Sequence, residues 1–88
     1  MVSGKVTVIN PSGLHLRPAG TLTQIAMKCD SDIVLIADEK TVDPKSILNL
    51  MSASITCGTS VTVRCEGKTE VDDLKTIVEA IKSGLGEN

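Results

Sequence analysis

The single histidine of the chain, His15, lies two residues after Gly13 and three residues before Pro18. Pro18 is typical of the first turn of a helix, because an amide hydrogen at that point would have no intrahelical partner. The spacing therefore predicts that His15 lies at or just before the N-terminus of a helix. Amide groups at such an end point outward with partial positive charge, so the turn favours an anion such as phosphate. These residue types alone do not decide whether His15 is a functional group or a solvated side chain without a function.

Arg17 favours the interpretation of this turn as an anion site. A cation in the first turn of a helix has the wrong sign for the helix dipole and costs roughly a few tenths of a kcal/mol. A bound anion offsets that cost, and a guanidinium presents a planar fork of donors to phosphoryl oxygens. Gly13 fits the same interpretation, because glycine supplies a positive φ or lets another molecule's backbone approach closely.

The composition is that of one small aliphatic domain spanning residues 1–88. The chain has 41% hydrophobic residues and no Phe, Trp or Tyr, so aliphatic side chains must form the core. Its nine basic and eleven acidic residues give a net charge of −2 and are scattered without long runs. This balance argues against a polyanion as partner, and the chain lacks the aromatic platforms of single-strand nucleic-acid binders. We therefore expect no direct binding of nucleic acid.

No segment of the sequence predicts insertion into a membrane. The longest apolar run, residues 33–37, is far shorter than the ~20 residues of a membrane span. The N-terminal residues also lack the apolar core of a signal peptide. We expect a cytoplasmic protein.

The three cysteines, Cys29, Cys57 and Cys65, are odd in number and lack C-x-x-C spacing. This pattern argues against both a disulfide framework and a zinc site. Unpaired cysteine usually behaves as a small hydrophobic residue, so we predict free, largely buried thiols. We expect no metal and no cofactor.

Hydrophobic periodicity predicts an α+β fold with the element order β-α-β-β-α-β-α. The expected strands lie near residues 5–9, 33–37, 40–43 and 60–65, and the expected helices near 16–28, 47–52 and 69–83. Two long helices can cover one face of a four-stranded, mainly antiparallel sheet and leave the other face more open. The last helix is expected to bury an apolar stripe of Val71, Leu74, Ile77, Val78 and Ile81.

The short helix carries more apolar surface than it can bury. Ser46 has the chemistry of its N-cap, and four large apolar residues follow within five positions: Ile47, Leu48, Leu50 and Met51. They cannot all face inward, so some are expected to form an exposed docking patch. Gly20, a poor residue for a helix interior, indicates close packing or a docking partner above it.

Three motifs together resemble the HPr family, the histidine-containing phosphocarriers of the bacterial phosphoenolpyruvate:sugar phosphotransferase system. They are Ser12-Gly13-Leu14-His15-Leu16-Arg17-Pro18-Ala19, Lys45-Ser46-Ile47-Leu48 with Met51-Ser52, and Gly84-Leu85-Gly86-Glu87. The first two lie at the separation expected in the family, and the resemblance covers essentially the whole chain. It implies an open-faced β-sandwich with the element order given above.

The resemblance implies that His15 accepts a phosphoryl group from enzyme I and passes it to the A domains of sugar-specific enzymes II, so that sugar uptake is driven with phosphorylation. A neutral imidazole nitrogen is nucleophilic, and its bond to phosphorus transfers readily. The backbone amides of Leu16 and Arg17 and the Arg17 guanidinium would hold the phosphoryl oxygens. The family uses Nδ1 of the ring, a choice that the residues alone do not make. Such a chain is a covalent carrier rather than a stand-alone enzyme, and is most simply a monomer.

The resemblance also implies a shared partner surface and a regulatory site. The expected partner-binding residues are Leu16, Gly20, Ile47, Leu48 and Met51. In many Gram-positive relatives the serine that matches Ser46 is phosphorylated by HPr kinase/phosphorylase, which links the family to a catabolite-control regulator. A phosphate there would suit the helix dipole and repel an acidic partner surface. The alternative is that Ser46 serves only as a helix cap.

The chain departs from the family's usual residues at three places. Leu16 stands where Ala is usual, Ala53-Ser54 where Leu-Gly is usual, and Asp38-Glu39-Lys40 where a hairpin turn usually has Asn-Gly-Lys. Leu16 is bulkier beside His15, so it narrows partner choice or strengthens apolar docking. The other two departures concern partner affinity and the geometry of the hairpin.

Two alternatives come from other classes of protein. A metal carrier of ferredoxin-like topology would need paired cysteines in a loop, whereas the three cysteines are dispersed. A regulatory binding module would act through Ser46 and the apolar patch with His15 idle. Regulatory paralogues that lack the histidine match this chain less well, because His15 is present.

Overall fold

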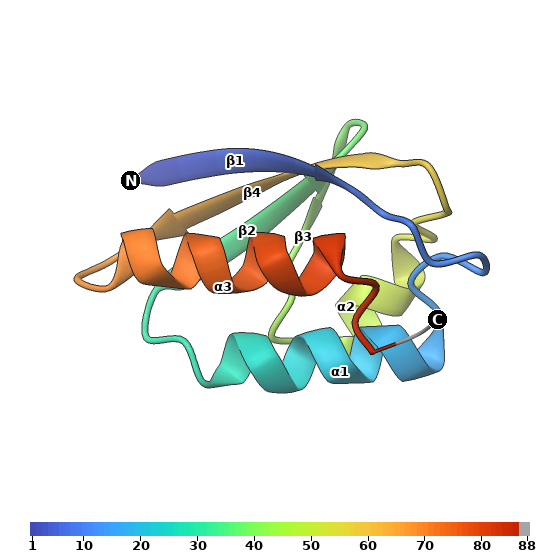
Figure 1. Cartoon of the computed structure of the whole chain (residues 1–88), viewed down its shortest axis with the longest axis horizontal. Helices are drawn as coiled ribbons and strands as arrows, with labels where there is room; N and C mark the ends of the chain where they lie inside the picture. Colours follow the sequence, from blue (N-terminus) through green and yellow to red (C-terminus); the bar gives the residue numbers. More distant parts are fainter. Residues whose placement is uncertain (87–88) are drawn as a thin grey trace.

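The computed structural model, which describes residues 1–86, contains four strands and three helices (Figure 1). The elements are β1 Val2–Thr7, α1 Leu16–Met27, β2 Asp32–Ala37, β3 Lys40–Val42, α2 Ile47–Ser52, β4 Ser60–Glu66 and α3 Glu70–Lys82. This is the predicted order. Glu87, the last residue of the third sequence motif, lies outside the described residues.

The first strand begins and ends earlier than predicted. Pairing with β4 runs from Val2 to Thr7, so residues 2–4 belong to the strand and Ile9 does not. Val8 still exchanges backbone hydrogen bonds with the loop before β4, through its amide to Thr59 O at 3.0 Å and its carbonyl from Gly58 N at 2.8 Å. These loop contacts explain why apolar alternation continues past the end of the strand.

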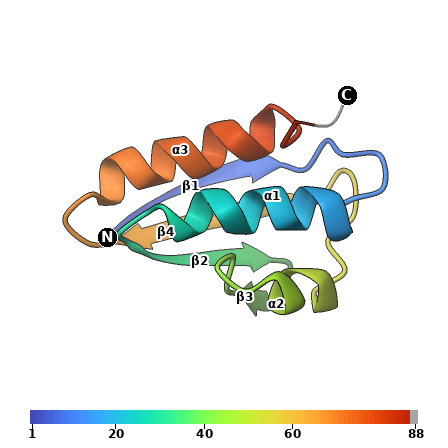
Figure 2. The ribbon, with the colours of Figure 1, turned by 90° about the horizontal axis from the view of Figure 1, so that it is seen from below.

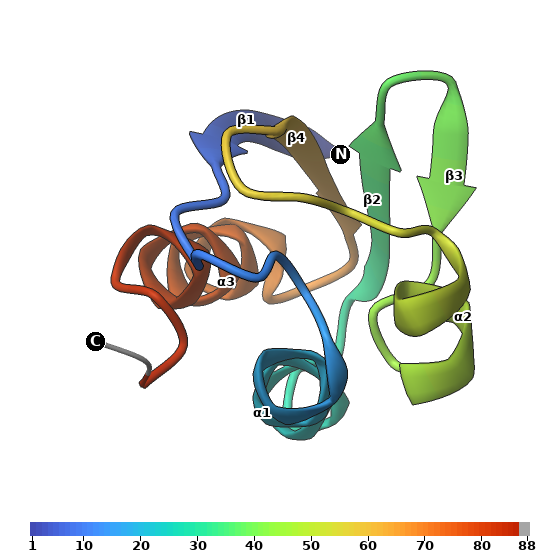
Figure 3. The same cartoon turned by 90° about the vertical axis from the view of Figure 1, so that its right-hand side faces the viewer.

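The four strands form one antiparallel sheet in the order β1-β4-β2-β3. All three helices lie on one side of it and leave the other face open (Figure 3). α1 packs against both α3 and α2, and α3 also packs on β1 and β4 (Figure 2). The alternation along β4 fits this arrangement, because Val61, Val63 and Cys65 are buried while Ser60, Arg64 and Glu66 are exposed.

The core is aliphatic, as the composition predicts. Its largest fully buried members include Leu22, Leu35, Leu50, Ile77 and Ile81. One prediction for α3 is wrong: Val71 is 67% exposed. At 3.6 residues per turn it lies about 100° around the helix from the midpoint of Ile77 and Ile81.

The cysteines only partly follow the prediction. All three are free, and Cys29 and Cys65 are buried, but Cys57 is exposed in the loop that precedes β4. Burial raises the pKa of the Cys65 thiol to about 11. In residues 1–86, no helix is long and apolar enough to cross a membrane, and no three His, Cys, Asp or Glu side chains gather as metal ligands.

Candidate functional site

His15 is the N-cap of α1, as the Pro18 spacing predicts. Its backbone is extended, with φ −82° and ψ −166°, and its carbonyl accepts the first helical hydrogen bond from Ala19 N at 2.9 Å. The residue is exposed. The first amides of a helix have no intrahelical acceptor, so those of Leu16 and Arg17 are available at this end, and Pro18 has none to offer.

Contacts with distant parts of the chain hold the loop that carries His15. Within the loop, Gly13 N donates to Asn10 O at 2.8 Å. The side chain of Asn10, itself 1% exposed, donates from Nδ2 to Gly84 O at 2.8 Å. The buried Leu14 donates its amide to Ile55 O at 2.9 Å. The histidine is therefore presented from a loop that is anchored on both sides.

Gly13 is required by this packing. Its φ is +70°, a region that residues with a side chain rarely adopt. A Cβ at this position would lie 2.2 Å from Ile55 O and 2.9 Å from Thr56 Cα. Of the two roles expected for Gly13, the structure shows the positive φ, and the backbone that lies close to it is the chain's own, at the Ile55 carbonyl that also accepts from Leu14 N.

Arg17 is exposed at the second position of α1. Within residues 1–86 the one ion pair joins the N-terminal ammonium to Glu70 at 2.9 Å, so no carboxylate holds the Arg17 guanidinium. No acidic residue lies in the first turn of α1. The helix dipole and Arg17 both contribute positive charge beside His15, an arrangement that suits a phosphoryl group.

A surface hollow of about 310 Å³ lies beside His15. Its lining is Ser12, Leu14, His15, Met51, Ser54, Ile55 and Thr56. The sequence analysis did not predict a role for Ser12, Ser54 or Thr56, which line the same hollow as His15. Ser12 is the first residue of the histidine motif. Ser54 and Thr56 flank Ile55, which accepts a hydrogen bond from Leu14, and no local pattern indicates that pairing.

Ser54 has a φ of +52° in the turn that follows α2. This left-handed position after a helix is where glycine is commonest, because a side chain costs about 1–2 kcal/mol there. The replacement of Leu-Gly by Ala53-Ser54 therefore keeps the turn and adds strain at the edge of the hollow. Asp38, at φ +55° in the β2–β3 turn, stands where the family usually has Asn, and both Asp and Asn tolerate this region better than most residues.

The predicted docking patch is exposed next to this site. Ser46 caps α2 by accepting a hydrogen bond from Asn49 N at 3.2 Å, and Leu50 is the member of the apolar set that is fully buried. Leu48 is 78% exposed and Met51 39% exposed. Met51 lines the hollow together with His15, so α2 and the start of α1 share one surface.

Gly20 lies where α1 meets α2. A Cβ at Gly20 would lie 3.6 Å from Ile47 Cδ1, which is an ordinary contact distance. An alanine would therefore fit at this position, and the packing of α2 on α1 does not require the glycine. Leu16, one turn earlier on α1, is 62% exposed. All five predicted partner residues lie on α1 and α2: Leu16, Gly20, Ile47, Leu48 and Met51.

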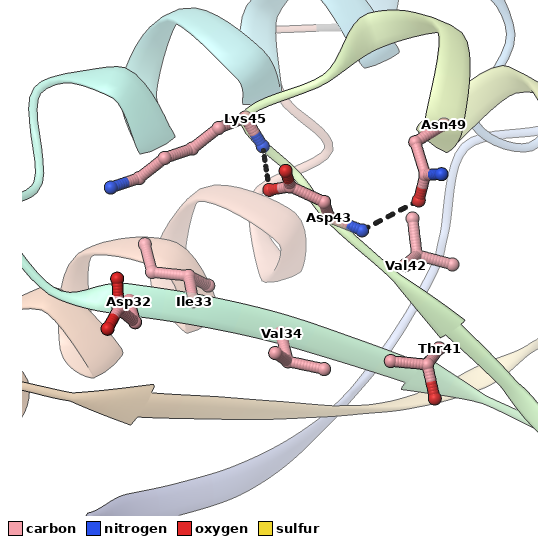
Figure 4. A pocket seen from close by; sticks show the side chains of 8 residues that line it. All are labelled: Asp32, Ile33, Val34, Thr41, Val42, Asp43, Lys45 and Asn49. Carbon is pink, nitrogen blue, oxygen red and sulfur yellow. Dashed lines mark hydrogen bonds between the residues drawn. The ribbon is translucent and has the colours of Figure 1, made fainter.

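A larger hollow of about 470 Å³ lies between β2, β3 and the segment that leads to α2 (Figure 4). Three of its polar residues, Asp43, Lys45 and Asn49, are joined by hydrogen bonds. Asp43 N donates to Asn49 Oδ1 at 2.7 Å, and Lys45 N donates to Asp43 Oδ1 at 2.9 Å (Figure 4). Lys45 Nζ donates to the carbonyls of Cys29 and Ser31 at 3.1 and 2.9 Å. This cluster fixes α2 against the α1–β2 connection and includes neither His15 nor Arg17.

The carboxylates with shifted pKa values lie at the start of α3. Hydrogen bonds from Ser31 and Thr69 lower the pKa of the buried Asp73, with Ser31 N at 3.0 Å and Thr69 Oγ1 at 2.7 Å from Oδ2. The N-terminal ammonium, followed by the Gly67 amide, lowers the pKa of Glu70. Neither carboxylate is among the residues that line the hollow beside His15. These hydrogen bonds therefore lie apart from the hollow and tie the start of α3 to the N-terminus and to Ser31.

Comparison with known proteins places this geometry in context. Residues 2–83 match the family described as the PTS HPr component phosphorylation site. The phosphocarrier protein HPr of Treponema pallidum is 39% identical over 87 residues, which cover 99% of each chain. The phosphocarrier protein HPr of Mycoplasma capricolum is 37% identical over 85 residues, covering 97% of this chain and 91% of the relative. The crystal structure of HPr-C-His from Thermoanaerobacter tengcongensis has a TM-score of 0.93 at 36% identity, covering 100% of this chain and 99% of that one.

Proposed function

The chain belongs to the HPr family of phosphocarrier proteins of the phosphotransferase system, and on this premise we propose that His15 carries the phosphoryl group. In this proposal His15 accepts the group from phospho-enzyme I and donates it to the A domains of sugar-specific enzymes II. The observation that carries the proposal is the exposed imidazole at the N-cap of α1, where Arg17 has no carboxylate partner among the described residues.

The chemistry follows from this placement. The lone pair of a neutral imidazole nitrogen forms the N–P bond while the bond from phosphorus to the donor atom breaks, and its electron pair leaves with the donor. The amides of Leu16 and Arg17 and the Arg17 guanidinium then face the phosphoryl oxygens. Fixed donors of this kind stabilise charge without reorganising during the transfer. The reverse sequence passes the group to the acceptor.

The first test is the intact mass of the chain after incubation with phosphoenolpyruvate and a bacterial enzyme I. We expect the mass of one phosphate to be gained and to be lost on brief acid treatment. His15→Ala should abolish the gain. A gain that persists in His15→Ala would contradict the proposal, and nitrogen-15 NMR of the phosphorylated chain would identify the ring nitrogen.

Arg17 is tested by the rate of this phosphorylation. Removing a donor that stabilises developing charge costs about 10²–10³ in rate, so Arg17→Ala should slow phosphorylation by at least about tenfold, and Arg17→Lys by less. Lys75→Ala removes one exposed cation from α3 and is the matched control. Equal rates for Arg17→Ala and Lys75→Ala would exclude a role for Arg17.

We also propose that Ser46 is a regulatory phosphorylation site for HPr kinase/phosphorylase and that a catabolite-control regulator binds the modified chain. Ser46 is half-buried at the N-cap of α2, next to the exposed Leu48. A phosphate there adds negative charge to an otherwise apolar docking patch. Incubation with the kinase and ATP should add one acid-stable phosphate that Ser46→Ala removes and Ser54→Ala retains. An acid-stable phosphate in Ser46→Ala would place the modification elsewhere.

The remaining parts of the proposal concern the state of the protein. It acts as a cytoplasmic monomer and as a covalent relay that turns over no substrate by itself. Multi-angle light scattering should give the mass of one chain, both with and without phosphate on His15. A dimer mass would contradict the monomer.

A further inference from the structure

Ser54 has a strained backbone conformation. Its φ of +52° is in the left-handed region, which residues with a side chain rarely adopt. In the part of the chain that the structure describes, the residues other than glycine with a positive φ are Asp38, Ser54 and Leu85. Leu85 is buried in the core, and Asp tolerates the region better than most residues, but neither explanation applies to the exposed Ser54. Strain of this kind is found most often at functional sites.

Hydrogen bonds on both sides hold Ser54 in place. The carbonyl of Ala53 accepts from Lys40 Nζ at 2.9 Å, and the carbonyl of Ile55 accepts from Leu14 N at 2.9 Å. Ala53 and Ile55 are themselves buried. Because Leu14 immediately precedes the histidine, the second bond joins the Ser54 segment to the loop that carries the imidazole. The fold therefore fixes the position of Ser54 relative to that loop.

Within residues 1–86, the hydroxyl of Ser54 has no hydrogen-bond partner, in contrast to the hydroxyls of its neighbours. Ser52 Oγ donates to Asn49 O at 3.0 Å, and the hydroxyl oxygens of Thr56 and Thr59 lie 3.2 Å apart. The exposed Ser54 hydroxyl is thus available to a group bound at this surface.

Ser54 lines the same hollow of about 310 Å³ as His15. None of the residues that line this hollow is acidic, so none would repel an anion there. A hydroxyl is a neutral donor that suits an anionic oxygen. The helix amides and Arg17 would reach a phosphoryl group from α1, whereas Ser54 belongs to the turn after α2 and would add a donor from a second element.

From these observations we propose that the Ser54 hydroxyl donates a hydrogen bond to the phosphoryl group carried on His15. The inference rests on the proposed function, and it adds a donor that comes from outside α1. Hydrogen bonds to charged groups are about twice as strong as those between neutral groups. This bond offsets the backbone strain, because a glycine would relax φ but supply no hydroxyl.

The first experiment measures the equilibrium constant for phosphoryl transfer from phospho-enzyme I, using the intact masses of both proteins recorded without acid. Ser54→Ala keeps the Cβ and removes the hydroxyl, whereas Ser54→Gly also relieves the strain. A hydrogen bond to a charged group is strong enough to shift an equilibrium by about tenfold. Both variants should therefore lower the constant by at least about threefold. A smaller loss in either variant would overturn the inference.

Asp38→Gly is the matched control. Asp38 has nearly the same φ, +55°, but lies in the β2–β3 turn and does not line the hollow. Both glycine variants should melt higher than the parent, Ser54→Gly by roughly 4–8 °C and Asp38→Gly by no more than that. Only Ser54→Gly should also lose phosphate at equilibrium. An equal loss of phosphate in Asp38→Gly would overturn the inference.

The outcomes separate this inference from the proposed function. If the parent gains acid-labile phosphate on His15 and Ser54→Ala gains it to the same extent at equilibrium, the carrier function stands and the hydroxyl has no part in it. If the parent gains no phosphate, the carrier function fails and the inference fails with it. A loss of threefold or more that is confined to the two Ser54 variants supports both.

Discussion

Replacing Gly13 with alanine should have two effects: it should destabilise the chain and displace His15. The Cβ of an alanine in the present backbone would lie 2.2 Å from Ile55 O and 2.9 Å from Thr56 Cα. Both are backbone atoms, so the contact cannot be relieved by a side-chain rotation. The loop must move away from the segment that precedes β4, and that movement separates Leu14 N from Ile55 O, now 2.9 Å apart.

The expected cost has two parts. A residue with a Cβ at φ +70° costs about 1–2 kcal/mol in conformational free energy. Loss of the Leu14 hydrogen bond adds about 0.5–1.5 kcal/mol, so the free energy of unfolding should fall by about 2–3 kcal/mol. At ~4–8 °C per kcal/mol for a domain of this size, the melting temperature should fall by roughly 10–20 °C.

Gly58→Ala is the matched control. Gly58 has a φ of +90°, but a Cβ there would meet no atom within 4 Å. It therefore carries the conformational cost without the collision. Differential scanning calorimetry should show a larger drop for Gly13→Ala than for Gly58→Ala, and Gly13→Ala alone should slow phosphorylation of His15 at a temperature where both variants are folded. Equal drops in melting temperature would refute the argument that the backbone contact fixes the His15 loop.

Three further outcomes follow from the structure. The pKa of Asp73 is lowered in the folded state by hydrogen bonds from Ser31 and Thr69, so its contribution to stability is complete above the unfolded pKa of about 4 and is lost as pH falls through the folded value. Asp73→Asn should melt lower than the parent at pH 7, and the difference between the two should shrink on acidification below about pH 4. Ser46→Ala removes the hydrogen bond that Asn49 N donates to the Ser46 hydroxyl, so the free energy of unfolding measured by chemical denaturation should fall by about 1 kcal/mol. A fall of more than about 2 kcal/mol would indicate a role beyond capping. One thiol, Cys57, should react quickly with Ellman's reagent, and rapid reaction of Cys65, whose pKa is raised to about 11 by burial, would contradict its placement.

Local patterns were enough to predict the elements and the position of the histidine. Alternation along β4 and the apolar spacing of α1 each reflect burial on one face, and this signal is present in the residues themselves. Pro18 and Ser46 are equally local, because a helix start depends on a few neighbouring residues. The element order and the N-cap position of His15 therefore agree with the structure.

What the sequence could not show depends on contacts between distant residues. Asn10 bonds to Gly84 across 74 positions, and Leu14 bonds to Ile55. Val71 was assigned to the buried stripe by the apolar spacing along the helix, but it is exposed, and the charged Asp73 is buried. Asp73 accepts hydrogen bonds there from Ser31 in the α1–β2 connection and from Thr69 at the start of α3, and hydrophobic periodicity does not indicate either bond.

α1 and α2 together carry one charged side chain, that of Arg17, and this bears on how one surface could serve two kinds of partner. Under the proposed function, the donor must bind the free histidine and the acceptor must bind the phosphorylated one. A phosphoryl group adds roughly −1.5 to −2 charges to helices that otherwise carry Arg17 alone. On a face crowded with lysines this change would be a small fraction of the total charge, whereas on α1 and α2 it reverses the sign of their net charge. The apolar residues can then supply binding to both partners, and the phosphoryl group itself supplies the difference between them.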